Sequence, residues 1–264
     1  EGTLGVVVEA TMRLTTAPAD TSVLVVGAPN MRAVMRLLDT FQSKLSLSAF
    51  EFFSDLAMQK VLDHSELQRP FETRAALYAL LEIEHQLVSD VEVALQLFES
   101  CVANGWALDG VISQTESQAQ SLWRLRENIS EAISRWTPYK NDVSTPVSSI
   151  PDFISEVDAV INQSYPDFEV VWFGHIGDGN LHLNVLKPDD LSVESFRRHC
   201  DQVSSAVFEV VERYGGSVSA EHGIGLLKKD YLHLSRSTQE VAIMRGIKRA
   251  FDPHGIMNPG KIFD

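Results

Sequence analysis

The chain has 264 residues, of which 44% are hydrophobic and 22% charged, a composition typical of one large or two small globular domains. Its formal net charge of −14 argues against a nucleic-acid partner, because binding to phosphates needs clustered Lys and Arg. The sequence has neither an apolar run of about eighteen residues nor a basic-then-apolar start, so it predicts neither a transmembrane helix nor a signal peptide.

The first half of the chain predicts alternating strands and helices. Val-rich residues 4–14 and 23–27 favour strands separated by a turn. Pro29 and Asn30 then open an amphipathic helix over 30–43, where apolar residues recur at helical spacing. The pattern continues with a strand at 45–53, a helix at 54–63, a strand at 75–84, a helix at 88–104, a strand at 106–113 and a helix at 115–136.

The second half contains a hairpin between further helices. The dipeptide Asp178-Gly179 is a hairpin signal between strands at 168–175 and 181–187. The other expected elements are an extended segment at 140–147, helices at 151–164 and 191–214, a short strand at 217–220, a helix from about Ile224 and a last helix at 237–250. We therefore expect an α+β fold, a ferredoxin-like antiparallel sheet with helices covering one face and two related β-α-β halves.

Two cysteines, Cys101 and Cys200, lie far apart in unrelated contexts. So few cysteines argue against a disulfide framework. We therefore expect a reducing compartment, which is the cytoplasm or, in a eukaryote, the mitochondrial matrix.

Two glycine-rich segments, GHIGDGNLHLN at 174–184 and SAEHGIG at 219–225, carry the candidate chemistry. His175 and His182 flank the predicted hairpin, so their imidazoles are expected to lie close together and could bind a divalent metal. Glu221 could be a third ligand, and a His₂Glu set with an open position is typical of catalytic zinc. The alternative is that these are polar hairpin residues paired with the backbone.

Other ionisable residues could act on a substrate. His222 adjoins Glu221 and must point elsewhere, where it could serve as a general base, the alternative being a capping or core histidine. Arg126 and Lys140 are candidate anion holders, because a guanidinium matches a carboxylate and an ammonium attracts one. The alternative for both is a solvated surface charge.

Several motifs resemble the C-terminal half of FAD-linked 2-hydroxy-acid dehydrogenases of the vanillyl-alcohol-oxidase type. They are SAEHGIGLLKKD, GHIGDGNLHLNV, LWRLRENISEAI with YKNDVSTPV, LSAFEFF and the terminal FDPHGIMNPGKIF. The resemblance covers essentially the whole chain. It is greatest to the D-2-hydroxyglutarate dehydrogenases, followed by D-lactate dehydrogenases and the flavin subunit of glycolate oxidase.

The resemblance implies a division of the chain and a missing partner domain. Residues 1–10, which begin EGTLG without a Met, resemble the end of an upstream flavin-binding domain, which would hold most of the FAD. Residues 11–236 would be the substrate-binding cap, and 237–264 a helix and tail that return to the flavin. We therefore expect a fragment that is inactive alone because it lacks the hydride acceptor.

The resemblance also assigns roles to single residues. His175, His182 and Glu221 match the family's metal ligands, usually zinc, and His222 matches the base that takes the proton from the C2 hydroxyl. The family's polar contacts with the substrate are matched here by Arg126, Lys140, Asn184 and Ser130. Ser130 stands where close relatives have Thr. Asn258, in the NPGK motif, matches a position near the flavin.

The implied reaction is oxidation of a D-2-hydroxy acid of the 2-hydroxyglutarate class to the 2-oxo acid. A metal would assist proton abstraction by His222, and a hydride would pass to FAD. The implied partners are the small 2-hydroxy acid, an electron acceptor protein or quinone, and a second copy in a homodimer. The alternatives are a D-lactate or glycolate dehydrogenase of the same family, a non-catalytic binding or assembly domain, and a flavin-independent metallohydrolase.

Overall fold

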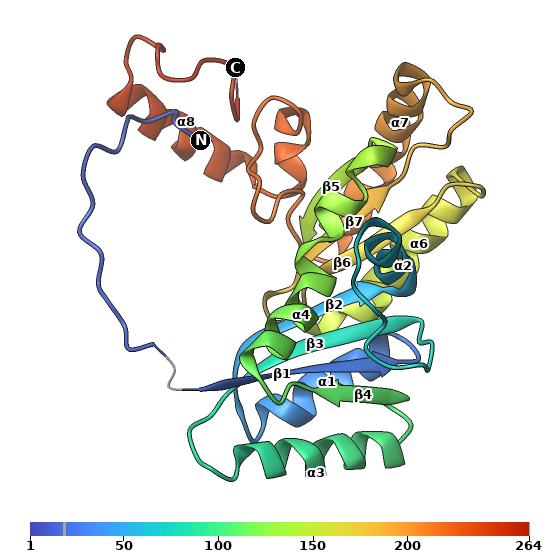
Figure 1. Cartoon of the computed structure of the whole chain (residues 1–264). Helices are drawn as coiled ribbons and strands as arrows, with labels where there is room; N and C mark the ends of the chain where they lie inside the picture. Colours follow the sequence, from blue (N-terminus) through green and yellow to red (C-terminus); the bar gives the residue numbers. More distant parts are fainter. Residues whose placement is uncertain (18–19, 264) are drawn as a thin grey trace.

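A seven-stranded antiparallel sheet organises the computed structural model, which describes residues 1–17 and 20–263 (Figure 1). The strands lie in the order β4-β1-β3-β2-β6-β7-β5, and every neighbouring pair is antiparallel. Their bounds are β1 Thr21–Ala28, β2 Ser46–Ser54, β3 Leu77–Glu84, β4 Asp109–Ile112, β5 Tyr139–Ser144, β6 Val170–His175 and β7 Asn180–Val185.

Helices occupy most of the segments between the strands. They are α1 Met31–Gln42, α2 Asp55–His64, α3 Asp90–Ala103, α4 Glu116–Glu127, α5 Ile129–Ala132, α6 Ile150–Ser164, α7 Val193–Arg213 and α8 Thr238–Phe251. Local sequence starts them as expected. The Asn30 side chain caps α1 by accepting the N–H of Ala33 at 3.0 Å, and Ser237 and Glu240 form a capping box on α8. No helix in the described ranges is long and apolar enough to span a membrane.

The sheet is built from two ferredoxin-like halves, as the sequence predicts. In the first half the chain runs β1-α1-β2-β3-α3-β4, with α2 inserted, and the strand order is β4-β1-β3-β2. The second half repeats this as β5-α6-β6-β7-α7, and a single bridge between Ser144 and Ser217 stands where its fourth strand would be. The halves join where Glu51–Phe53 of β2 pair with Phe173–His175 of β6.

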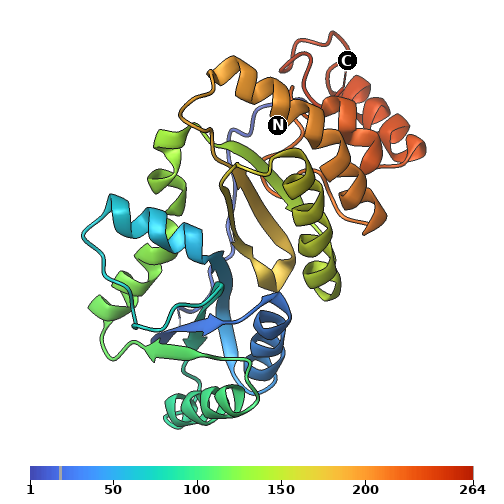
Figure 2. The same ribbon diagram turned by 90° about the vertical axis from the view of Figure 1, so that its right-hand side faces the viewer.

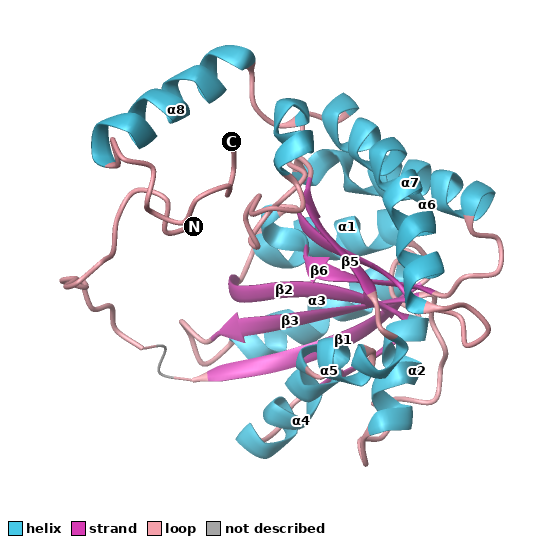
Figure 3. Cartoon of the chain, turned by 90° about the horizontal axis from the view of Figure 1, so that it is seen from above, coloured by secondary structure: helices cyan, strands magenta, loops and turns pink. Residues whose placement is uncertain are grey.

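Helices pack on both faces of the sheet, not on one as expected (Figure 3). Alternate residues of β1 enter different cores, since Leu24 and Val26 belong to one apolar cluster and Val23 and Val25 to the other. The first cluster includes residues of α1, α3, α6 and α7, and the second includes residues of α2, α4 and α5. Because both faces of β1 are apolar, each must be covered.

The strand expected at 4–14 is wrong. They belong to an N-terminal arm, residues 1–17, that has no helix or strand, and Val6, Val7 and Val8 are 77%, 84% and 93% exposed. A strand needs a neighbour for its backbone hydrogen bonds, and this arm pairs with none of the strands that the structure describes. The Val-rich pattern favours extended backbone, but β structure also requires a partner.

Two of the expected helices also differ from those in the structure. The helix expected at 115–136 is divided into α4, α5 and the 3₁₀ turn η1 Ser134–Trp136, and Thr137 ends it with a left-handed φ of 47°. The helix expected from Ile224 is instead the 3₁₀ helix η4 Lys229–Leu234. Gly223 and Gly225 have φ of 81° and 55°, which a right-handed helix does not accommodate.

Candidate active site

Strand β7 alternates polar and apolar side chains along its whole length. The apolar ones lie in the core beneath α6 and α7: Leu181, Leu183 and Val185. The polar ones point to the opposite face: Asn180, His182 and Asn184. Residues paired across strands share a face, so Lys140, Asp142 and Ser144 of β5 lie beside them. A polar surface therefore covers this end of the sheet.

The hairpin between β6 and β7 brings the two expected histidines together. The ring centroids of His175 and His182 are 5.5 Å apart, which confirms the expected proximity. The turn is tight because Gly179 has a φ of 79°, and a Cβ there would lie 2.1 Å from the carbonyl oxygen of Thr145. Glycine is therefore required where the hairpin passes against the loop after β5.

Each imidazole faces a buried carboxylate through its Nδ1 atom. His175 Nδ1 lies 2.7 Å from Glu51 Oε1, and His182 Nδ1 lies 3.7 Å from Asp142 Oδ1. The Nε2 atom of His175 lies 3.2 Å from Glu221 Oε1, and potential ligand atoms of His175, His182 and Glu221 are all within 4.8 Å of one another. Carboxylates behind histidines are the usual support of a metal site, so this set fits a divalent metal such as zinc.

The surroundings of the two imidazoles shift their pKa values in opposite directions. Burial and the nearby Arg126 charge lower the pKa of His182 to about 4, so its ring is neutral at pH 7. The hydrogen bond to Glu51 raises the pKa of His175 against the opposing effect of burial. A neutral imidazole is the form that a metal site requires, so the protonation state of His182 is compatible with that expected role.

Asp142 links the strand to the second glycine-rich segment. It is fully buried, and its Oδ2 atom accepts the backbone N–H groups of Glu221 and His222, both at 2.8 Å. Burial alone would raise the pKa of Asp142, but these two hydrogen bonds lower it below its usual value. His222 Nδ1 lies 3.9 Å from the same carboxylate atom, and its side chain is 56% exposed. The carboxylate thus lies beside both the buried His182 ring and the exposed His222 ring.

Arg126 is buried, and the surface-charge alternative is wrong for it. Its Nη2 atom lies 2.9 Å from Glu51 Oε2, and its guanidinium stacks 4.7 Å from the Phe173 ring centroid. Burial lowers its pKa, while the charge of Glu51 opposes that shift. Through Glu51, this cation is connected to His175.

The remaining predicted contacts lie at different depths. Lys140 is exposed and lies opposite Asn184 in the pairing of β5 with β7. Asn184 is 2% exposed, and its buried Nδ2 atom has no hydrogen-bond partner in the described structure. Ser130 is exposed on α5, four positions after Arg126 in the sequence. Asn258 lies in the C-terminal tail and donates from Nδ2 to the carbonyl of Glu1 at 2.6 Å.

Four further residues of the site were not predicted from the sequence: Glu51, Asp142, Asn180 and Lys228. Asn180 Nδ2 donates to Glu221 Oε1. Lys228 donates to the backbone oxygens of Asp142 and Val218 at 3.0 and 2.6 Å, and burial lowers its pKa to about 8. A signal did exist for Glu51 and Asp142, because each is an acidic residue inside a strand whose neighbours are largely buried.

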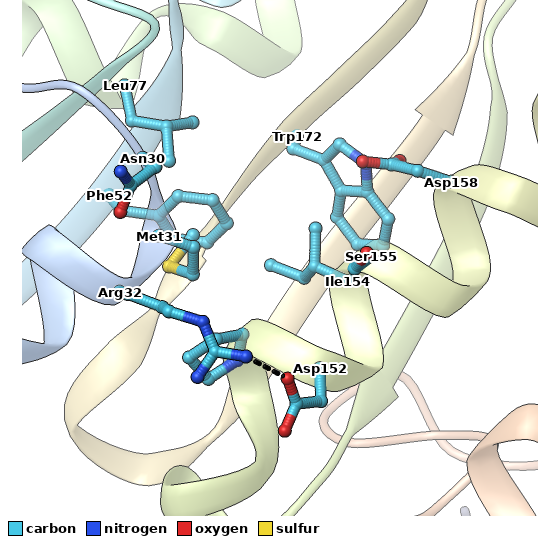
Figure 4. A pocket seen from close by; sticks show the side chains of 11 residues that line it. Asn30, Met31, Arg32, Phe52, Leu77, Asp152, Ile154, Ser155, Asp158 and Trp172 are labelled. Atoms are coloured by element: carbon cyan, nitrogen blue, oxygen red, sulfur yellow. Dashed lines mark hydrogen bonds and ion pairs between the residues drawn. The ribbon is translucent and has the colours of Figure 1, made fainter.

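A separate hollow of about 480 Å³ lies between the N-terminal ends of α1 and α6, on the other face of the sheet (Figure 4). Phe52 and Trp172 line it, and Arg32 pairs with Asp152 at its edge, 2.5 Å apart. Neither His175 nor any other candidate site residue lines it. The candidate chemistry therefore belongs to the polar face and not to this hollow.

Comparison with known families identifies the chain. The sequence model of the family described as "FAD linked oxidases, C-terminal domain" matches residues 17–262. The chain belongs to this family. This confirms the resemblance carried by its motifs, and it makes the antiparallel sheet with its helices the FAD-linked oxidase C-terminal fold. It also implies FAD as the cofactor of the family's chemistry.

Related proteins in this family extend well beyond the matched region. The D-2-hydroxyglutarate dehydrogenase of Stutzerimonas stutzeri is 57% identical over 263 residues, covering 100% of the chain and 57% of that protein. The enzyme of the same name from Xanthomonas citri pv. viticola is 50% identical over 264 residues, covering 56% of its length. A putative mitochondrial D-lactate dehydrogenase of Schizosaccharomyces pombe is 34% identical and covered to 51%. The chain spans a little over half the length of these curated relatives and matches their C-terminal part.

Solved structures agree on the fold. Substrate-bound p-cresol methylhydroxylase superposes with a TM-score of 0.65 at 14% identity, over 94% of this chain and 53% of that one. The 4-ethylphenol oxidase of Gulosibacter chungangensis gives 0.64 at 14% identity, over 96% and 55%. At such identity the likeness concerns the fold alone, so it supports the architecture and leaves the site to be argued from this chain.

Proposed function

We propose that this chain is the substrate-binding part of an FAD-dependent dehydrogenase that oxidises a D-2-hydroxy acid of the 2-hydroxyglutarate class to the 2-oxo acid. The observation that carries the proposal is the cluster of two carboxylate-supported imidazoles, Glu221 and the exposed His222 on one polar face. The names of the two relatives that are 57% and 50% identical support the choice of substrate class.

The proposed division of labour follows the exposure of the chain's ends. Residues 1–10 would be the end of an upstream flavin-binding domain, 11–236 the cap, and 237–264 a segment that returns to the flavin. The arm carries exposed valines, and α8 has no buried residue, so both present apolar surface for a further domain. Asn258, at the meeting of arm and tail, would lie nearest the flavin.

His175, His182 and Glu221 would hold a divalent metal, with zinc matching their two imidazoles and one carboxylate. Such an ion, when bound, supplies a Lewis acid that stabilises negative charge on the substrate's oxygens. The chain's own contribution is orientation. Glu51 would fix the His175 ring through the contact at Nδ1, and Asp142 lies 3.7 Å from His182 Nδ1, so both rings would keep Nε2 for ligation.

His222 would take the proton of the C2 hydroxyl on its Nε2 atom, because its Nδ1 atom faces Asp142. Its half-exposed ring is accessible to a substrate, whereas His182 is buried and supported as a ligand. FAD, when bound, would supply the acceptor for the C2 hydride, and the role of this chain would be to hold the substrate and take the hydroxyl proton at His222.

Recognition of a carboxylate requires local positive charge in a chain of net charge −14. Lys140 would supply it together with Arg126, whose guanidinium also pairs with Glu51. Asn184 would add a buried amide with an unsatisfied donor beside Lys140. Ser130, on the helix that follows Arg126, would add a hydroxyl. An electron acceptor protein or quinone would reoxidise the flavin, and we expect the full-length protein to form a homodimer.

A second candidate is oxidation of D-lactate, favoured by the relative of 34% identity with that name. Glycolate oxidation by the same kind of site and a non-catalytic assembly role compete with it, and a screen of substrates separates all of them.

Both cysteines are free and buried, which agrees with the proposed reducing compartment, the cytoplasm or a mitochondrial matrix.

The test is to screen the flavin-loaded full-length protein against D- and L-forms of 2-hydroxyglutarate, lactate and malate, together with glycolate, using an artificial electron acceptor. We expect the highest kcat/KM with D-2-hydroxyglutarate. A preference for D-lactate or glycolate would replace the substrate class, and inactivity toward all of them in flavin-loaded protein would refute the function.

A further inference from the structure

The segment that carries His222 continues as a loop that binds a carboxylate through its backbone. Gly223 and Gly225 have left-handed φ values of 81° and 55° on either side of Ile224. Such alternation turns successive backbone N–H groups toward one side of the chain and forms a concave site for an anion. We use the term base loop for residues 221–225.

The carboxylate in this site belongs to Glu1. Glu1 Oε1 accepts the N–H of Ile224, and Oε2 accepts the N–H of Gly225, both at 2.7 Å. A Cβ at Gly223 would lie 2.7 Å from Glu1 Oε1, so the approach depends on glycine. Each carboxylate oxygen of Glu1 accepts one charge-assisted hydrogen bond, so the contact is bidentate.

The backbone around Glu1 is held as well. Asn258 donates to the carbonyl of Glu1, and Lys248 of α8 donates to the carbonyl of Thr3, both at 2.6 Å. Figures 1 and 2 both show the N-terminus beside α8. The arm, the base loop and the C-terminal tail therefore meet at one place.

We propose that Glu1 is a positioning residue that fixes the base loop and, through it, the ring of His222. The loop is held at both ends by carboxylates, because Asp142 accepts the N–H groups of residues 221 and 222 and Glu1 those of 224 and 225. The His222 ring is half exposed and 3.9 Å from Asp142, so its place depends on the backbone that carries it. Releasing one end lets the ring leave its productive position.

This inference rests on the proposed function for the role of His222, and it extends that function across the domain boundary. Residues 1–10 are the proposed end of the flavin-binding domain. A carboxylate from the flavin-binding domain would then position His222, the general base in the cap domain. His222 would therefore be in place only when both domains are joined. The hydrogen bonds themselves depend on no assumption about the reaction.

The test compares Glu1→Gln with Glu9→Gln in the full-length protein. Glu9 is an exposed acid on the same arm, so its substitution removes the same charge without touching the base loop. Hydrogen bonds to charged groups are worth ~1.5–3 kcal/mol, so amide exchange at Ile224 and Gly225 is expected to quicken by about ten- to hundred-fold in Glu1→Gln. We expect kcat to fall at least about ten-fold, with KM and flavin content unchanged, because orientation and not binding is lost. Glu9→Gln is expected to behave as wild type in each measurement.

Unchanged exchange at Ile224 and Gly225 in Glu1→Gln would overturn the proposal, as would faster exchange with an unchanged kcat. A rise in KM alone would assign Glu1 to substrate binding and would also overturn it. Inactivity of the wild-type protein toward every 2-hydroxy acid would refute the proposed function, and the exchange rates would still decide whether Glu1 holds the loop.

Discussion

Substitution of Asp142 by Asn is the sharpest perturbation that the site offers. Asn has almost the same shape as Asp, so the packing of this fully buried side chain is kept. Its carbonyl oxygen can still accept the N–H groups of Glu221 and His222, but as a neutral acceptor. Its amide would stand near His182 Nδ1, where the carboxylate oxygen now lies 3.7 Å away, and a donor there would favour the tautomer with the ring proton on Nε2, the atom proposed to bind metal.

The expected magnitude follows from these contacts. Hydrogen bonds to charged groups contribute ~1.5–3 kcal/mol and neutral ones ~0.5–1.5, so two weakened bonds lower the free energy of unfolding by about 2–3 kcal/mol. Loss of the carboxylate behind a ligating histidine lowers metal affinity about 10- to 100-fold. Because the folded pKa of Asp142 is lowered, its stabilisation is full above the unfolded pKa of about 3.9 and is lost as pH falls through the folded value. The difference in stability between Asp142→Asn and wild type should therefore narrow below about pH 4.

The assay is zinc competition with a chromophoric chelator, combined with urea unfolding of the metal-free chain at several pH values. Asp158→Asn is the matched control, because Asp158 is a partly buried carboxylate on the other face that accepts the N–H of Trp172 at 2.7 Å. It should leave zinc affinity unchanged. Wild-type zinc affinity in Asp142→Asn would refute the reasoning about the tautomer of His182.

Three further predictions concern the metal, the thiols and the flavin. The double variant His175→Ala/His182→Ala should lose stoichiometric metal by elemental analysis, and retained metal would place the site elsewhere. Cys101 and Cys200 should resist alkylation at pH 8 until the chain is unfolded, because both are buried and burial raises the pKa of Cys200 to about 12; rapid reaction of the folded chain would contradict their burial. The chain without its flavin domain should oxidise no 2-hydroxy acid in the presence of an artificial acceptor, and turnover there would show that the hydride acceptor lies within these residues.

Local patterns in the sequence predicted the part of the site that lies on neighbouring strands. The Asp178-Gly179 turn and the alternation after it place His175 and His182 on adjacent strands, and the ring separation of 5.5 Å confirms that proximity. The ferredoxin-like repeat was predictable for the same reason, since each β-α-β unit is encoded within one continuous stretch. Their roles as ligands remain predictions.

The supporting residues could not be predicted from such patterns, because their partners are distant in sequence. Glu51 reaches His175 and Arg126 only because β2 and β6 join the two halves of the sheet. Asp142 meets residues 221 and 222 across about eighty positions of chain. Charge and solvation alone favoured a surface position for Arg126, and only the fold shows that it is buried beside the Glu51 carboxylate.

The most direct measurement of the central claim is the oxidation of D-2-hydroxyglutarate by flavin-loaded full-length protein, compared between wild type and His222→Ala at equal flavin content. If His222 is the base, kcat should fall about 10²- to 10⁴-fold in His222→Ala while bound flavin and metal stay at wild-type levels. A kcat that survives the substitution would contradict the assignment of His222 and the interpretation of this polar face as a catalytic site.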